Sequence, residues 1–370
     1  MGCEIQGRPG NDAFDDLAAK PSTLPPGLSV LWVGSKGGME MDLVRRAGIP
    51  FDAIPAAGLH GVGWKSLPGN LAQLVGGYRK ARKILREYRP EVLFFTGGYV
   101  AVPMALAGRK TPSVLYVPDI EPGLALKTLA RFSHCIALTA EESRVYFPRQ
   151  AKTVVTGYPT RQDLRSWNKQ AALEKLDLSP DVPTLLVFGG SKGARSINRA
   201  VLAVLPELLI QMQVVHITGH LDWPEAEIAR NTIAQGTKAH LLQHYRAFPY
   251  LHEEMGAALS AADIVLSRAG ASSLGEFPLL GLPAILVPYP YAWRYQQVNA
   301  QFLAKHGAAL IVSDADLPNQ LLEVVCNLMR DSDRREKMSR AMSSLARPEA
   351  AKSIGQLLQK LVVEKGRERI

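Results

Sequence analysis

The chain has 370 residues, of which 47% are hydrophobic and 21% charged, a balance that predicts a globular protein with enough apolar material for more than one core. No apolar run approaches the roughly 20 residues that a membrane-spanning helix needs, and the first 20 residues lack the apolar core of a secretory signal. The formal charge of +9 favours anionic partners such as nucleotides or acidic lipid headgroups, whereas the dispersed basic residues and the absence of a recognisable motif argue against nucleic acid.

In the first half of the chain, short apolar runs rich in β-branched residues alternate with stretches of helical apolar spacing. The runs predict strands at 28–33, 92–96, 113–117, 135–139 and 153–156, and the amphipathic stretches predict helices at 69–88 and 123–132. Such an alternation predicts a parallel sheet covered on both faces.

The same alternation begins again after residue 160. The predicted strands there are 184–188, 214–218, 239–243, 264–267, 284–287 and 309–312. We therefore expect an α/β protein with two doubly wound, Rossmann-like domains, residues 1–158 and 159–347. We also expect a helix in residues 348–370 that packs back on the first domain. Ligands of such folds bind beyond the carboxyl ends of the strands, so the cleft between the halves is the expected site.

A glycine-rich turn follows the predicted strand 184–188. It contains Gly189, Gly190, Ser191 and Gly193 and leads into a predicted helix at 198–208. Backbone N–H groups of such a turn, together with the positive end of the helix, suit a diphosphate. The alternative is a glycine turn required only for close packing of strand and helix.

Two further small-residue turns also follow strands. The first comprises Ala271, Ser272, Ser273, Leu274, Gly275 and Glu276, and the second comprises Thr96, Gly97 and Gly98. Glu276 is placed to meet a ribose while the amides of its turn meet phosphate, unless it is simply a solvated acidic residue at a helix start. With Gln296, Gln297 and Asn299 farther along the chain, the paired turns describe a nucleotide-diphosphate site better than a dinucleotide site. The turn at 96–98 either holds the phosphate of an acceptor or is a packing turn.

Several motifs in a fixed order resemble one family. They span 37–44, 95–100, 156–161, 189–195 and 281–288, and the resemblance runs from about residue 31 to 361. The chain resembles the MurG-type transferases, which convert lipid I to lipid II in peptidoglycan biosynthesis. The resemblance implies a GT-B fold and inverting transfer of N-acetylglucosamine from UDP-N-acetylglucosamine to undecaprenyl-diphosphate-linked N-acetylmuramyl-pentapeptide.

The resemblance also implies roles for individual residues. Arg161 and Ser191 would approach the donor diphosphate, Leu251 would abut the uracil, residues 271–276 would hold ribose and phosphate, and Gln296 would contact hydroxyls of the donor sugar. We expect no cofactor and no metal, because the Asp-x-Asp patterns at 314–316 and 331–333 precede helices, where Asp is favoured as a cap.

The sequence departs from the family pattern in two places. The family opens with a glycine-rich loop containing Thr-Gly-Gly-His, to which the general base is assigned, and the first 26 residues here contain nothing comparable. Asp119 stands where the family commonly has Asn. Asp119 and Glu121 are therefore candidate bases, with a helix cap as the alternative role of Asp119.

These departures leave two hypotheses: an active transferase, or a truncated or noncatalytic relative that binds UDP-sugar or lipid without turnover. A nicotinamide-dependent dehydrogenase is disfavoured, because no Gly-x-Gly-x-x-Gly fingerprint with a following acidic residue opens either half.

Apolar and basic residues mix over the segment 63–83. The apolar members include Trp64, Leu74, Val75 and Tyr78, and the basic members are Lys65, Arg79, Lys80, Arg82 and Lys83. The mixture suits an anionic membrane surface, and the alternative is a core-facing helix with a solvated basic edge. A lipid-linked acceptor favours the first interpretation, so we expect peripheral binding at the cytoplasmic face of the cell membrane.

Overall fold

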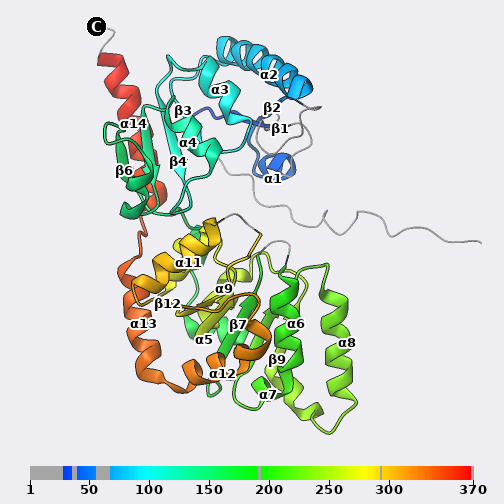
Figure 1. The fold of residues 1–370 in the computed structure, drawn as a ribbon. Coiled ribbons are helices and arrows are strands. Elements are labelled where there is room, and N and C mark those ends of the chain that lie inside the picture. Colours follow the sequence, from blue (N-terminus) through cyan, green and yellow to red (C-terminus); the bar gives the residue numbers. More distant parts are fainter. Residues whose placement is uncertain (1–27, 36–39, 56–66, 191–192, 292–293, 368–370) are drawn as a thin grey trace, which may run out of the picture. The chain divides into compact units, whose positions relative to one another are not determined.

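The computed structural model describes residues 28–35, 40–55, 67–190, 193–291 and 294–367 (Figure 1). Contacts divide the chain into two compact units, one made of residues 1–93 and 97–111 and the other of 94–96 and 112–370. These units do not coincide with the segments 1–158 and 159–347 expected from the sequence, because residues 112–158 group with the larger unit. The domain division at 158 and 159 stays a prediction.

Over its described residues, the smaller unit contains a two-stranded parallel sheet and three helices. Strands β1 (Trp32–Ser35) and β2 (Phe51–Ile54) pair with each other, and the helices are α1 (Glu40–Arg46), α2 (Leu67–Tyr88) and α3 (Ala101–Ala107). Helix α2 packs against α3 and β2. A Cβ at Gly77 of α2 would lie 2.3 Å from the carbonyl oxygen of Pro55, so only glycine lets the helix approach the end of β2 this closely.

A four-stranded sheet has the order β3-β4-β5-β6. Its strands are β3 (Leu93–Phe95), β4 (Ser113–Val117), β5 (Cys135–Leu138) and β6 (Thr153–Val155), and β4, β5 and β6 run parallel. Helix α4 (Leu124–Ala130) packs on β4. The last helix, α14 (Ala350–Arg367), lies along this sheet, and its Ile354, Leu357 and Leu361 share one buried cluster with side chains of β4 and β5 (Figure 1).

A six-stranded parallel sheet has the order β12-β11-β10-β7-β8-β9. Its strands are β7 (Thr184–Phe188), β8 (Gln213–Ile217), β9 (Tyr245–Phe248), β10 (Ile264–Ser267), β11 (Ala284–Leu286) and β12 (Ala309–Ile311). The order reverses next to β7, the first strand of this sheet along the chain. This is the doubly wound arrangement, and ligands bind such sheets at the carboxyl ends of the strands beside the reversal.

Side chains of β7 point alternately to the two faces of this sheet. Leu185 and Val187 join the cluster beneath α6 (Arg195–Ala203), α7 (Leu205–Leu209) and α12 (Leu317–Arg330), whereas Leu186 joins the cluster of the opposite face. The opposite face is covered by α5 (Lys169–Lys175), α9 (Met255–Ala261), α10 (Glu276–Leu280) and α11 (Tyr295–Lys305). Because both faces are covered, β7 is a continuous apolar run, and the predicted α/β class with parallel sheets is confirmed.

Three details of the predicted elements are wrong. The strand expected at 28–33 is β1, which begins only at Trp32 and ends at Ser35. Residues predicted as a strand at 239–243 form the 3₁₀ helix η5 (Ala239–His244), and the strand β9 follows directly, starting at Tyr245. Leu241 of η5 is buried in the core, which explains why the segment 239–243 is apolar although it is not a strand. Only the next segment, Tyr245–Phe248, pairs with β8. Strand β2 was not predicted, since its four residues alternate too briefly to show a period.

Candidate active site

A pocket of about 1030 Å³ opens at the carboxyl ends of strands β7, β10 and β11 in the larger unit. The polar and glycine residues of its wall are Gly189, Gly190, Gly193, Arg195, Ser196, Arg199, Ser267, Arg268, Gly270, Ser272, Ser273, Tyr289, Gln296 and Asp314. It therefore brings together the first glycine turn, part of the second small-residue turn and Gln296, which the sequence placed in one donor site.

The glycine turn after β7 is closely coiled. A Cβ at Gly189 would lie 2.2 Å from the Cβ of Ala194, and the φ angles of Gly190 and Gly193 are 93° and 77°. The N–H of Gly193 donates to the carbonyl of Gly190 at 2.9 Å. The positive φ angles favour glycine at Gly190 and Gly193, and the close contact with Ala194 favours it at Gly189, whereas a Cβ at Gly190 would meet nothing within 4 Å. Ser191, expected to donate a hydroxyl bond, lies outside the described residues.

A buried polar network anchors the start of α6 beside this turn. Asp222, only 3% exposed, accepts from Nε of Arg195 at 2.9 Å and from Nδ2 of Asn198 at 2.8 Å. Asn198 Oδ1 lies 3.0 Å from Nε2 of His216, whose Nδ1 lies 3.0 Å from the hydroxyl of Tyr245. Arg195 is held by its Nε at the pocket rim, and its side chain remains 59% exposed.

Arg268, at the end of β10, supplies a buried cation to the pocket wall. It is 8% exposed, and it donates to the carbonyl of Val287 at 3.0 Å, to Ser196 Oγ at 2.7 Å and to Asp314. Its guanidinium lies 5.2 Å from the ring centroid of Tyr289. Asp314 is therefore not a helix cap, because its carboxylate is engaged by Arg268 and Ser196. In the second Asp-x-Asp pattern, Asp331 does cap α13 (Ser332–Ser344), since its side chain accepts from the N–H of Arg334 at 2.9 Å.

The second small-residue turn forms the 3₁₀ helix η6 (Ala271–Leu274), and α10 then begins at Glu276. The N–H of Ser273 donates to the carbonyl of Gly270 at 3.0 Å. A Cβ at Gly275 would lie 2.7 Å from the ring of Tyr158, which explains the glycine at the junction. Burial raises the pKa of Glu276, and the Arg161 guanidinium acts in the opposite direction.

Arg161 and Leu251 lie with Glu276 rather than in the pocket wall. Nη1 of Arg161 donates to the carbonyl of His252 at 3.4 Å, next to Leu251, and the Arg161 charge acts on the carboxylate of Glu276. Leu251 is half-buried against the core. The predicted donor residues therefore form two neighbouring groups, one in the pocket wall and one that contains Arg161, Leu251 and Glu276. The turn 271–276 joins the two groups.

Gln296 and Asn299 lie one helical turn apart on α11. Gln296 Oε1 accepts from the N–H of Tyr289 at 2.9 Å in the pocket wall. Asn299 is fully buried, and its Nδ2 donates to Asp119 Oδ1 at 2.8 Å and to the carbonyl of Ala269 at 3.1 Å. Helix α11 thus connects the pocket to the loop that contains Asp119.

The two candidate bases lie in different surroundings. Burial raises the pKa of Asp119 above its ordinary value, and the hydrogen bond from Asn299 opposes the shift. Glu121 is paired with Arg294 at 2.8 Å and with Lys127 at 3.6 Å. Asp119 does not cap α4, whose N-cap is Gly123 without a side-chain bond, so the alternative role as a cap is wrong.

The loop after β3 contains the third predicted turn. Gly97 and Gly98 have φ angles of 115° and 80°, values that favour glycine, and Thr96 is exposed. A role for this turn in acceptor binding stays a prediction. Among the described residues, no group of three or more His, Cys, Asp or Glu side chains could hold a metal ion.

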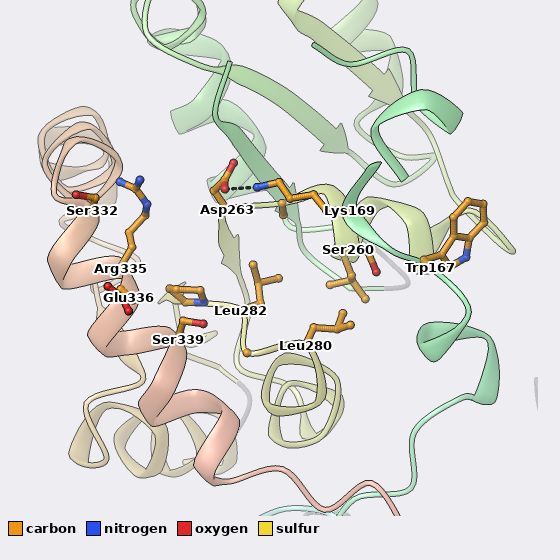
Figure 2. A pocket seen from close by; sticks show the side chains of 14 residues that line it. Trp167, Lys169, Ser260, Asp263, Leu280, Leu282, Ser332, Arg335, Glu336 and Ser339 are labelled. Carbon is orange, nitrogen blue, oxygen red and sulfur yellow. Dashed lines mark hydrogen bonds and ion pairs between the residues drawn. The ribbon is translucent and has the colours of Figure 1, made fainter. Parts of the chain in front are cut away.

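A second, smaller pocket of about 470 Å³ lies at the amino ends of β10 and β11, where Asp263 and Pro283 precede the strands. Figure 2 shows Lys169 pointing at Asp263, with Arg335 and Glu336 approaching from α13 (Ser332–Ser344). Arg335 donates to the carbonyls of Leu328 and Met329. The charged groups of this smaller pocket are bound to other protein groups. The pocket also lies at the end of the strands opposite to the glycine turns.

Sequence reasoning gave no role to Arg195, Arg268 and Tyr289. It grouped Asn299 with Gln296 at the site but did not predict that Asn299 binds Asp119. The sequence signal for Arg268 is an arginine directly after the buried strand Ile264–Ser267. Charged residues are rarely placed at the end of a buried strand without a partner or a ligand. Tyr289 has no comparable local signal.

Comparisons with known proteins give the family of the chain. Residues 25–138 match the model of the Glycosyltransferase family 28 N-terminal domain, and residues 184–354 match that of the Glycosyltransferase family 28 C-terminal domain. The UDP-N-acetylglucosamine--N-acetylmuramyl-(pentapeptide) pyrophosphoryl-undecaprenol N-acetylglucosamine transferase of Roseiflexus sp. (strain RS-1) is 39% identical over 376 residues, which cover 91% of this chain and 84% of the relative. The transferase of the same name from Desulforamulus reducens is 36% identical and covers 90% and 91% of the two chains.

Solved structures also match the fold of this chain. The crystal structure of Acinetobacter baumannii MurG matches with a TM-score of 0.69 and 25% identity, over 90% of this chain and 91% of that one. A UDP-GlcNAc 2-epimerase from Neisseria meningitidis, with a TM-score of 0.60 and 16% identity over 90% and 91% of the chains, shares the fold. The resemblance and the GT-B fold class expected from the sequence are thereby confirmed, and the chain belongs to the MurG family of glycosyltransferase family 28.

Proposed function

We propose that the chain transfers N-acetylglucosamine from UDP-N-acetylglucosamine to the muramyl hydroxyl of undecaprenyl-diphosphate-linked N-acetylmuramyl-pentapeptide. The observation that carries this proposal is the pocket at the carboxyl ends of β7 and β10, built from two small-residue turns. Glycine turns at the start of a helix commonly bind anions through backbone amides, and the position of the pocket is the usual ligand site of a doubly wound sheet. The names of the curated relatives support the same donor and acceptor.

In this proposal the two groups of donor residues divide the UDP-sugar between them. The glycine turn and the start of α6 hold the diphosphate, with Arg195 at the rim as an additional cation. Arg161 approaches the diphosphate from the other side, Leu251 abuts the uracil, and Glu276 accepts hydrogen bonds from the ribose. Gln296, in the pocket wall, contacts hydroxyls of the sugar.

Asp119 is the base in this proposal, in preference to Glu121. A general base is most effective when its pKa is close to the working pH, and burial moves Asp119 in that direction. Oδ1 of Asp119 is bound to Asn299, and Oδ2 has no hydrogen bond to any described residue. Glu121 already pairs with two cations, Arg294 and Lys127, which compete for its oxygens.

These proposed roles define the chemistry of the transfer. Oδ2 of Asp119 takes the proton of the acceptor hydroxyl as its oxygen attacks the anomeric carbon. The bond from that carbon to the diphosphate breaks on the opposite side, and the electron pair leaves with UDP. The configuration at the anomeric carbon is therefore inverted. Backbone amides and cations of the pocket stabilise the charge that develops on the leaving diphosphate.

The transferase is tested by binding and turnover together. Calorimetry should detect UDP-N-acetylglucosamine in preference to UDP-glucose and NAD, and a lipid I analogue should cause release of UDP. The variant Asp119→Asn should retain donor binding and lose turnover by at least about 10²-fold. Donor binding without any turnover of the lipid I analogue by the unchanged chain would instead support the noncatalytic alternative, and preference for NAD would reject the donor.

The proposal includes peripheral binding to the cytoplasmic face of the membrane, where a lipid-linked acceptor lies. Val75 and Tyr78 of α2 are 45% and 37% exposed, and Arg79 and Arg82 are exposed beside them. Lys80 is less available, because it pairs with Asp52 at 2.8 Å. In the described part of the chain, no helix has an apolar stretch that could cross a bilayer.

Vesicle binding tests this part of the proposal. Each cation near an anionic surface contributes about 1 kcal/mol, so Arg79→Glu with Arg82→Glu should weaken binding to phosphatidylglycerol vesicles by at least about thirtyfold. The matched control reverses two exposed cations of α13, Arg334 and Lys337. Equal binding of the two double variants would contradict the assignment of α2 as the membrane-facing surface.

A further inference from the structure

Asn299 connects three elements from a fully buried position. Its Nδ2 donates to Asp119 Oδ1 at 2.8 Å and to the carbonyl of Ala269 at 3.1 Å, and its Oδ1 accepts from the N–H of Ile120 at 3.1 Å. Three hydrogen bonds thus fix the loop after β4, the end of β10 and helix α11 to one amide. No other side chain type of this size supplies both the two donors and the acceptor that these partners need.

The neighbours of Asn299 on α11 contact the same loop or the donor pocket. Arg294 pairs with Glu121 at 2.8 Å, and a Cβ at Gly123 would lie 3.1 Å from the hydroxyl of Tyr295. Gln296, one turn before Asn299, lines the donor pocket. A single rigid helix therefore carries the proposed sugar contact and the amide that binds Asp119.

We infer that Asn299 is a positioning residue, which orients the carboxylate of Asp119 and fixes it relative to Gln296 through helix α11. The inference rests on the proposed function, in which Asp119 is the base. Asn299 binds Oδ1 and leaves Oδ2 to take the proton, so rotation of the carboxylate is restricted. Fixing a base relative to the donor sugar reduces the orientational entropy that must be lost at the transition state.

Asp119 interacts with few other titratable groups in the described part of the chain. Tyr116 and Tyr158 are the two that face it, and burial raises the pKa of both phenols, which are therefore neutral near pH 7. Tyr158 also interacts with Glu276. The hydrogen bond from Asn299 is the influence that favours ionised Asp119, so its removal should shift the titration of Asp119 to higher pH.

The test compares pH profiles of turnover. Asn299→Asp replaces the donor amide by a second carboxylate, and Asn299→Ala removes the amide without adding charge. We expect the acidic limb of the kcat profile to move to higher pH in both variants, further in Asn299→Asp. At a pH on this limb, kcat falls tenfold for each unit of the shift, while the KM for UDP-N-acetylglucosamine changes less than about threefold.

The control is Gln301→Glu, the same change of amide to carboxylate on the exposed face of α11. This control variant should have the same acidic limb of the kcat profile and the same kcat as the unchanged protein. Calorimetry with UDP-N-acetylglucosamine identifies variants that retain the fold, and Asn299→Ala serves if the buried charge of Asn299→Asp prevents folding. A folded Asn299 variant whose limb and kcat match those of Gln301→Glu overturns the inference.

The variant Asp119→Asn separates the two proposals. If it retains turnover, Asp119 is not the base and the proposed mechanism fails together with this inference. If Asp119→Asn loses turnover while the acidic limb of the Asn299 variants matches that of the unchanged protein, the assignment of Asp119 as the base stands and the positioning role of Asn299 is wrong.

Discussion

His216 should make the larger unit sensitive to acid. It is fully buried in β8, and Asn198 and Tyr245 occupy its two ring nitrogens. Nδ2 of Asn198 donates to Asp222 and to the carbonyl of Thr218, so Asn198 Oδ1 must accept the proton of His216 Nε2. Nδ1 of His216 then accepts from the hydroxyl of Tyr245. A second proton on the ring would remove this acceptor inside the core.

The size of the effect follows from the pKa. Burial lowers the pKa of His216 from 6.5 to about 4 in the folded protein. A lowered pKa favours the neutral ring, so the stabilisation is present above the unfolded value and is lost as the pH falls from 6.5 toward the folded value. Between about pH 7.5 and about pH 5 the linkage relation gives a loss of about 2 kcal/mol in the free energy of unfolding.

Urea unfolding followed by tryptophan fluorescence measures this loss. The neutral variant His216→Gln is less stable at every pH because it loses ring contacts, but its free energy of unfolding should fall by about 2 kcal/mol less between the two pH values. The exposed His240→Gln is the control and should keep the pH dependence of the unchanged protein. Parallel pH dependences of His216→Gln and the unchanged protein would refute the reasoning.

Three further predictions concern the site. Gly189→Ala should cost about 1 to 3 kcal/mol of stability and weaken UDP binding in calorimetry, since its Cβ would overlap Ala194, whereas Gly355→Ala, which meets open space, should cost nothing. Asp119→Asn should raise the melting temperature at neutral pH while turnover is lost. Because the pKa of Asp119 is raised in the folded protein, this group stabilises the fold below its unfolded pKa, and that stabilisation is lost as the pH rises. At neutral pH the ionised carboxylate is therefore a net cost, which the neutral amide removes. An unchanged or lower melting temperature would contradict this sign. Glu276→Gln should weaken UDP-N-acetylglucosamine binding by about tenfold, because a charged acceptor for the ribose becomes neutral, and unaltered affinity would exclude the ribose contact.

The sequence predicted the strands whose side chains are buried on both faces and the turns that follow them. Thr184–Phe188 and Ile264–Ser267 were predicted with the same bounds that the structure gives, because an uninterrupted apolar run that ends in glycine or small residues has few alternatives. Short strands with mixed burial were less predictable. Phe51–Ile54 was missed, and the strand at Tyr245–Phe248 was assigned to the apolar residues just before it.

The polar part of the site depended on strand order, which the local sequence does not contain. Arg268 meets Asp314 because β10 and β12 are both neighbours of β11 in the sheet. Asn299 meets Asp119 across a separation of 180 residues. Local patterns predict each residue's own element but not its partner from a distant element. The proposed choice of Asp119 over Glu121 therefore rests on the contacts of each carboxylate and not on the local sequence.

The packing of α14 on the four-stranded sheet has a consequence for synthesis of the protein. Val114, Tyr116, Cys135 and Ala137 are buried partly against Ile354, Leu357 and Leu361, more than 200 residues later in the chain. On the ribosome, this sheet is synthesised long before the helix that covers its apolar face, so that face stays exposed until α14 has been synthesised. We expect nascent chains that stop before residue 350 to bind chaperones at β4 and β5, and the release of α14 from the ribosome to end that exposure.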